Sequence, residues 1–195
     1  MNDALHAYAD DPQIMQVSGY MFDVLKFSAY DRAVMLPFTS SWGWATWGRA
    51  WAQFDHEATG WRALLQDRRQ RKQFNLGGVY DFATMLQRQM VDDQRKTSWA
   101  ILWYLSVFRA EGMVVFPPRS LVQNIGQDGT GTHGRALLRN FRGRPMEPGS
   151  ACRPVDARAA MLGRDEWKSV QQAIWRQNGG WLGSAVDLAK RIIRR

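Results

Sequence analysis

The stretch Ser41-Trp42-Gly43-Trp44-Ala45-Thr46-Trp47 concentrates more aromatic surface than any other part of the chain. With Trp51 and Trp61 it holds five of the ten tryptophans. Indole faces are costly to leave in water, so such a cluster needs either a core to fill or a flat ligand to stack on. A sugar ring presents a flat C–H face and is one such ligand.

Length and composition predict one main domain. The chain has 195 residues, 45% of them hydrophobic, which is enough for a sizeable core. The net charge of +8 favours anionic partners without choosing among phosphates, nucleic acid and an acidic membrane surface. The single cysteine, Cys152, excludes an internal disulfide and suits a reducing compartment. No long apolar run and no signal-peptide pattern occurs, so we expect a cytoplasmic location.

Hydrophobic periodicity predicts an α/β mixture without internal repeats. Strands are expected over 14–22, 34–38 and 113–116. Helices are expected over 2–9, 45–54, 61–74, 80–91, 98–110, 155–176 and 182–193. The helix over 45–54 rests on the spacing of Trp44, Trp47 and Trp51, which would give it one aromatic face.

A glycine-rich segment follows the last predicted strand. Between Ser120 and Gly134, four glycines alternate with Thr130, Thr132 and His133. Backbone N–H groups and hydroxyls in such a loop can gather around an oxyanion, and a phosphate is the natural guest. The segment lacks the Gly-Lys-Ser/Thr ending of a P-loop and the helix of a dinucleotide fingerprint. The pattern leaves a phosphate site and a plain surface loop as alternatives.

Four segments together resemble a known family. They are Ser18-Gly19-Tyr20-Met21-Phe22, the run from Leu36 to Trp47, Ser98-Trp99-Ala100-Ile101, and the run from Pro117 to His133. They resemble the second half of bacterial family 2-type glycosyltransferases with a GT-A fold, a group called hemolytic-protein-like. Its layout is similar to that of the eukaryotic N-acetylglucosaminyltransferase I group. The resemblance covers residues 1–134, and residues 135–195 are interpreted as a basic linker and helical tail.

The resemblance implies a partial GT-A fold: an acceptor-side half with a mixed short sheet and surrounding helices, followed by a helical C-terminal tail. It implies sugar transfer from a nucleotide-sugar to a glycan or lipid-linked acceptor, in cell-surface polysaccharide biosynthesis, with Mn or Mg as the metal of the complete enzyme. In that family the nucleotide-binding half ends in an Asp-X-Asp motif just before a helix resembling residues 1–9. We therefore expect a truncated or split transferase, inactive without a separate N-terminal half. The alternative is a non-enzymatic carbohydrate- or phosphate-binding module.

The resemblance also suggests roles for individual residues. It places Trp42, Trp44 and Trp47 beneath a sugar, although at least two of them filling the core is the competing interpretation. A loop that closes over the donor diphosphate would contain Gly129, Thr130, Gly131, Thr132 and His133, and His133 would contact phosphate or metal unless it is simply solvated. The catalytic base that accepts the acceptor hydroxyl's proton is assigned to Asp93 or Asp92, with Asp81 and Asp128 as alternatives.

The tail carries most of the remaining basic charge. The helix expected over 182–193 has an apolar side and ends in Arg194 and Arg195. It would suit peripheral contact with the inner membrane, or it packs on its own domain with basic residues near its C-terminal dipole. Nucleic acid is not an expected partner, because the basic residues form no recognisable reader motif.

Overall fold

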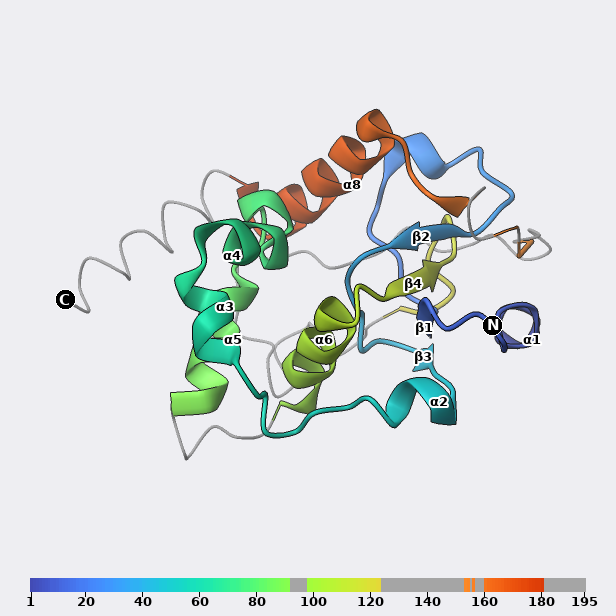
Figure 1. The fold of residues 1–195 in the computed structure, drawn as a ribbon. Coiled ribbons are helices and arrows are strands. Elements are labelled where there is room, and N and C mark those ends of the chain that lie inside the picture. Colours follow the sequence, from blue (N-terminus) through green and yellow to red (C-terminus); the bar gives the residue numbers. More distant parts are fainter. Residues whose placement is uncertain (92–97, 124–152, 155, 157–159, 181–195) are drawn as a thin grey trace.

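A four-stranded mixed sheet lies at the centre of the computed structural model, which describes residues 1–91, 98–123, 153, 154, 156 and 160–180 (Figure 1). Its two central strands, β1 (Ile14–Ser18) and β4 (Met113–Phe116), run parallel. β2 (Val34–Leu36) pairs antiparallel with β4, and β3 (Trp44–Ala45) pairs antiparallel with β1. The strand order is β2-β4-β1-β3, so β1 and β4 have a neighbour on each side.

The sheet separates two cores. On one face, Met15 joins a large core with helices α6 (Trp99–Arg109) and α8 (Arg164–Gln177). On the other face, Val17 joins a smaller core against which α1 (Asn2–Ala7) packs. Every residue of β1 is buried, as expected for a strand covered on both faces.

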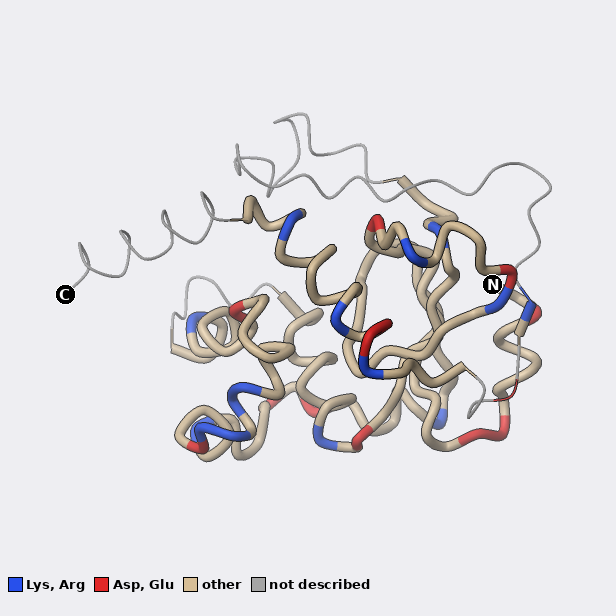
Figure 2. The backbone as a smooth tube through the Cα atoms, turned by 90° about the horizontal axis from the view of Figure 1, so that it is seen from above, with Lys and Arg blue, Asp and Glu red and all other residues tan. Residues whose placement is uncertain are grey.

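The other helices are short and lie at different places around the sheet. They are α2 (Gly48–Trp51), α3 (Trp61–Gln66), α4 (Arg68–Phe74), α5 (Phe82–Val91) and two 3₁₀ turns, Leu25–Phe27 and Leu76–Gly78. Figure 1 shows α3, α4 and α5 together at the end opposite α1. Figure 2 shows several Lys and Arg positions along this group of helices.

Two predicted helices are wrong in extent. The helix expected over 45–54 shrinks to α2, because Trp44 and Ala45 instead form β3 against β1. The helix expected over 61–74 is divided at Asp67, whose backbone is extended at φ −73° and ψ 112°. Asp67 caps α4 by accepting hydrogen bonds at Oδ1 from the backbone N–H groups of Arg69 and Gln70, at 2.8 and 3.0 Å.

Other expectations are confirmed, some with shorter bounds. The chain is a mixed α/β structure, and the strand over 113–116 and the helices over 80–91 and 98–110 are present. The first strand ends at Ser18, and the long helix expected from 155 begins at Arg164. The helix expected over 182–193 lies outside the described residues. Among the helices that the structure describes, none is long and apolar enough to cross a bilayer.

Candidate functional site

Five aromatic side chains meet beside the sheet and form what we call the tryptophan cluster: Trp44, Trp51, Phe54, Trp99 and Trp103. The ring centroids of Trp44 and Trp99 are 5.0 Å apart, and those of Trp51 and Trp103 are 5.1 Å apart. Phe54 stacks on Trp51 at 4.6 Å. Trp103 is 1% exposed, whereas Trp51 and Trp99 are 39% and 40% exposed. The cluster therefore has a buried base and an outer aromatic surface that reaches solvent.

The base of the cluster is held by a buried hydrogen-bond chain. Trp103 donates through Nε1 to Oε1 of Gln16 at 2.7 Å, and Gln16 donates through Nε2 to the carbonyl oxygen of Ser40 at 2.7 Å. Gln16 is fully buried on β1. Thr46 adds a bond from its hydroxyl to the carbonyl oxygen of Met15 at 2.6 Å. These bonds fix the segment around Trp44 to the sheet, so the outer indoles rest on a rigid support.

One member of the cluster, Trp44, lies at the carboxyl end of β1. Trp44 pairs with Ser18, the last residue of β1. Just beyond, the backbone N–H of Gly19 donates to the carbonyl oxygen of Gly43 at 2.5 Å, and the N–H of Leu121 donates to the carbonyl oxygen of Gly19 at 2.7 Å. In open α/β sheets, ligands bind outside the carboxyl ends of the parallel strands. The position of Trp44 agrees with that rule.

Trp42 belongs to a neighbouring aromatic group that is separate from the tryptophan cluster. Its ring meets Tyr20 edge-on, with centroids 4.6 Å apart. Burial raises the pKa of the Tyr20 hydroxyl well above its ordinary value, and the nearby carboxylate of Asp23 adds to the rise. Oδ1 of Asp23 is buried and has no hydrogen-bond partner among the described residues. A buried carboxylate oxygen of this kind, near Tyr20, marks Asp23 as a candidate polar contact for a ligand.

Trp47 belongs to the smaller core on the other face. Its Nε1 donates to the carbonyl oxygen of Leu5 at 3.0 Å, and the Arg49 guanidinium lies 4.6 Å from its ring centroid. Arg49 in turn donates to the carbonyl oxygens of Tyr8, Ala9 and Ile14 at 2.6 to 2.9 Å. These contacts attach α1 and the segment after it to the sheet. The structure therefore brings Trp44 into the cluster but places Trp42 and Trp47 elsewhere.

The remaining predicted site residues cannot be placed. Asp92, Asp93 and the loop residues Gly129, Thr130, Gly131, Thr132 and His133 lie outside the described residues, as does Asp128. Their roles stay predictions. Asp81 is described and lies just before α5, where its Oδ1 accepts from the backbone N–H of Thr84 at 3.2 Å. That contact is typical of a residue that caps the N-terminus of a helix.

Five side chains of the site were not among the predicted site residues: Trp51, Phe54, Trp99, Trp103 and Asp23. Trp99 and Trp103 are four residues apart, so the helical spacing alone places both indoles on one face of α6. That signal was available in the sequence. Nothing in the sequence around Asp23 marks it, because its significance depends on its distance from Tyr20 and on its missing partner.

A metal site is not found in the part of the chain that is described. There, no three His, Cys, Asp or Glu side chains lie close enough together to hold an ion. The divalent metal implied by the family resemblance stays a prediction. Comparison of the chain with protein-family models, with curated proteins and with solved structures gave no match.

Proposed function

We propose that this chain contributes the acceptor side of a glycosyltransferase with a GT-A fold, and that the tryptophan cluster binds a sugar ring. The observation that carries the proposal is the outer surface of Trp51 and Trp99, which stays in solvent although Trp44 and Trp103 hold it on a rigid base. Large apolar side chains that stay exposed together usually mark a binding site. The C–H face of a pyranose ring is a ligand that stacked indoles accept.

The enzymatic part of the proposal draws on the family resemblance. The Ser41–Trp47 stretch and the run from Pro117 to His133 support sugar transfer from a nucleotide-sugar donor to a glycan or lipid-linked acceptor. We propose that a divalent ion and a nucleotide-binding segment, on this or a separate chain, complete the site. Within this proposal, the described residues supply the sugar support beside β1.

A non-enzymatic carbohydrate-binding module is the second candidate. The cluster lies wholly within the described residues, and stacking a sugar on indole faces requires neither a metal nor a catalytic carboxylate. The chain could therefore bind a sugar without transferring it. Activity separates the two candidates, whereas sugar binding is common to both.

The first experiment is saturation-transfer NMR with the methyl glycosides of glucose, galactose, mannose and N-acetylglucosamine. Saturable binding of at least one glycoside is expected, with Trp99→Ala weakening it about tenfold, which corresponds to about 1.4 kcal/mol. Trp175→Ala is the matched control, because Trp175 is a half-buried tryptophan on α8 outside the cluster. Binding of no glycoside, or equal weakening by the control, would contradict the proposal.

A second measurement tests whether the chain transfers sugar without a separate nucleotide-binding half. The chain is incubated with manganese and with UDP-glucose, UDP-N-acetylglucosamine or GDP-mannose, and release of the nucleoside diphosphate is followed. Chain-dependent release supports a transferase. Glycoside binding without release from any of the three donors is expected both of a binding module and of a transferase half that needs a separate nucleotide-binding chain.

A further inference from the structure

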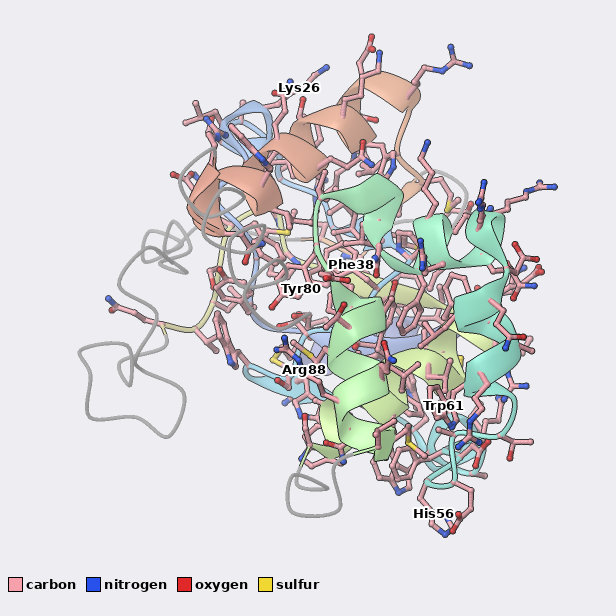
Figure 3. The ribbon with its side chains drawn as sticks, turned by 90° about the vertical axis from the view of Figure 1, so that its left-hand side faces the viewer. Lys26, Phe38, His56, Trp61, Tyr80 and Arg88 are labelled. Atoms are coloured by element: carbon pink, nitrogen blue, oxygen red, sulfur yellow. The ribbon has the colours of Figure 1, made fainter. Side chains whose placement is uncertain are left out.

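A cavity of about 750 Å³ lies between α3, α4 and α5. It shares no residue with the tryptophan cluster. Its polar and charged lining consists of Arg62, Gln66, Arg71, Asn75, Asp81, Thr84 and Gln87, beside the apolar Trp61, Leu65 and Val91. Figure 3 shows Trp61 on the side of α5 that faces α3 and α4, and Arg88 on the opposite side. Its volume falls in the range of sites for small molecules.

Two arginines give the cavity its charge. Neither Arg62 nor Arg71 forms an ion pair with a described residue. The Arg62 guanidinium lies 4.6 Å from the centroid of the Trp61 ring. Stacking on an indole holds a guanidinium in place while its in-plane N–H groups stay free to donate. Arg62 is thus positioned at the cavity wall with its donors unused.

The nearby carboxylates compensate only part of this charge, because two arginines and one aspartate line the cavity. Asp81 is the one acid among the described residues that line the cavity, and its Oδ1 already accepts from the N–H of Thr84 and from Nδ2 of Asn75, at 3.2 and 3.3 Å. Asp67, at the start of α4, accepts from two backbone N–H groups instead of from an arginine side chain. Arg68, Arg69 and Lys72 add further positive charge on α4. The cavity is therefore positive and has spare donors.

We propose that this cavity binds a phosphate group carried by a sugar-sized molecule, with Arg62 and Arg71 as its ligands. The planar fork of arginine matches phosphate oxygens through paired N–H bonds, which a compact ammonium does not provide. Gln66, Thr84 and Gln87 offer neutral donors for hydroxyl groups, and Leu65 and Val91 cover the apolar parts of the ligand. The site goes beyond sugar stacking on the tryptophan cluster and does not depend on it.

Isothermal titration of the chain with glucose 1-phosphate tests the site, with inorganic phosphate and glucose as separate arms. Saturable binding of glucose 1-phosphate is expected to persist at 0.3 M salt, because two directed arginine contacts are screened less than a diffuse field. Glucose is expected to bind at least tenfold more weakly than glucose 1-phosphate. Inorganic phosphate should compete for the site.

Charge-matched variants decide between a built site and general attraction to a basic surface. Arg62→Gln and Arg71→Gln should each weaken glucose 1-phosphate binding about tenfold or more, while Arg88→Gln should leave it unchanged because Arg88 lies on the other side of α5. All three positions are exposed, and circular dichroism checks that each variant is folded. Equal weakening by Arg88→Gln, no saturable binding, or glucose binding as tight as glucose 1-phosphate would overturn the proposal. Trp99→Ala should not affect this titration, so failure here is distinct from failure at the tryptophan cluster.

Discussion

Replacement of Gln16 by methionine tests whether the hydrogen-bond chain under the tryptophan cluster sets its rigidity. Gln16 is fully buried, accepts from Nε1 of Trp103 and donates to the carbonyl oxygen of Ser40, both at 2.7 Å. Gln16→Met keeps nearly the same volume but cannot serve either partner. The buried indole N–H and the partly buried Ser40 carbonyl then lose these bonds.

The expected cost follows from the loss of these two bonds. A buried polar group left without a partner costs about 1–3 kcal/mol and loss of an ordinary hydrogen bond about 0.5–1.5 kcal/mol, so Gln16→Met should lower the free energy of unfolding by about 1.5–4.5 kcal/mol. Domains of this kind typically have about 5–15 kcal/mol in total. In the Gln16→Met background, Trp103→Phe removes a donor that already has no acceptor. It should therefore cost about 1–3 kcal/mol less there than in the original chain.

Urea unfolding followed by circular dichroism measures all four members of this double-mutant cycle. Gln13→Met is the matched control, because Gln13 is exposed just before β1 and only its backbone is hydrogen-bonded to described residues. Its effect should stay within about 0.5 kcal/mol. Strict additivity of Gln16→Met and Trp103→Phe would refute the reasoning, because it would mean that the two side chains do not share a bond. A loss no larger than that of the control would refute it as well.

Three further substitutions have expected outcomes. Gly19→Ala should lower the free energy of unfolding in urea by about 1–3 kcal/mol, because the added Cβ would lie 2.6 Å from a backbone oxygen. Gly48→Ala is the control: its Cβ would have no atom within 4 Å, so the change should be neutral or slightly stabilising. Arg49→Lys should speed amide hydrogen exchange at the end of α1, because a lysine cannot replace three guanidinium bonds to backbone carbonyls; unchanged exchange would contradict this. The hydrogen bond from Tyr30 lowers the pKa of the Glu166 carboxyl group in the folded chain. The ionised carboxylate therefore stabilises the fold fully above about pH 4.3, the pKa of an unfolded glutamate, and this stabilisation is lost as the pH falls through the lower folded-state pKa. Glu166→Gln should accordingly lose less unfolding free energy between about pH 5 and pH 3 than the original chain does, and equal acid sensitivity would count against this role.

Elements with strong local signals were predicted well. The helix over 98–110 appears as α6, because an apolar run between Ser98 and Gly112 leaves little choice of structure. The strand over 113–116 matches β4 for the same reason. The division at Asp67 was missed although its signal is local, since an aspartate two and three residues before unpaired N–H groups is a typical helix cap.

The errors around the tryptophans have a different cause. Spacings of three and four among Trp44, Trp47 and Trp51 are helical, yet Trp44 enters a strand because β1 pairs with it from a distant part of the sequence. Trp44 and Trp51 still meet in the tryptophan cluster, whereas Trp47 packs on the smaller core at the other face of the sheet. The aromatic neighbours of Trp44 include Trp99 and Trp103, which the fold brings from a distant part of the sequence. Periodicity describes one segment at a time and cannot report such pairings.

The close contact between Gly19 and Gly43 links the residue types that positions 19, 43 and 122 can hold. Gly43 has φ of +55°, and a Cβ there would come within 2.5 Å of Cγ1 of Val122, while a Cβ on Gly19 would come within 3.2 Å of the same atom. The Val122 side chain thus fills the space into which a side chain at position 19 or 43 would project. Among sequences that adopt this fold, we expect a side chain at 43 only together with a smaller residue at 122. A design library should therefore vary 43 and 122 as a pair and keep 19 as glycine, because the obstacle there is main chain that no partner substitution can remove.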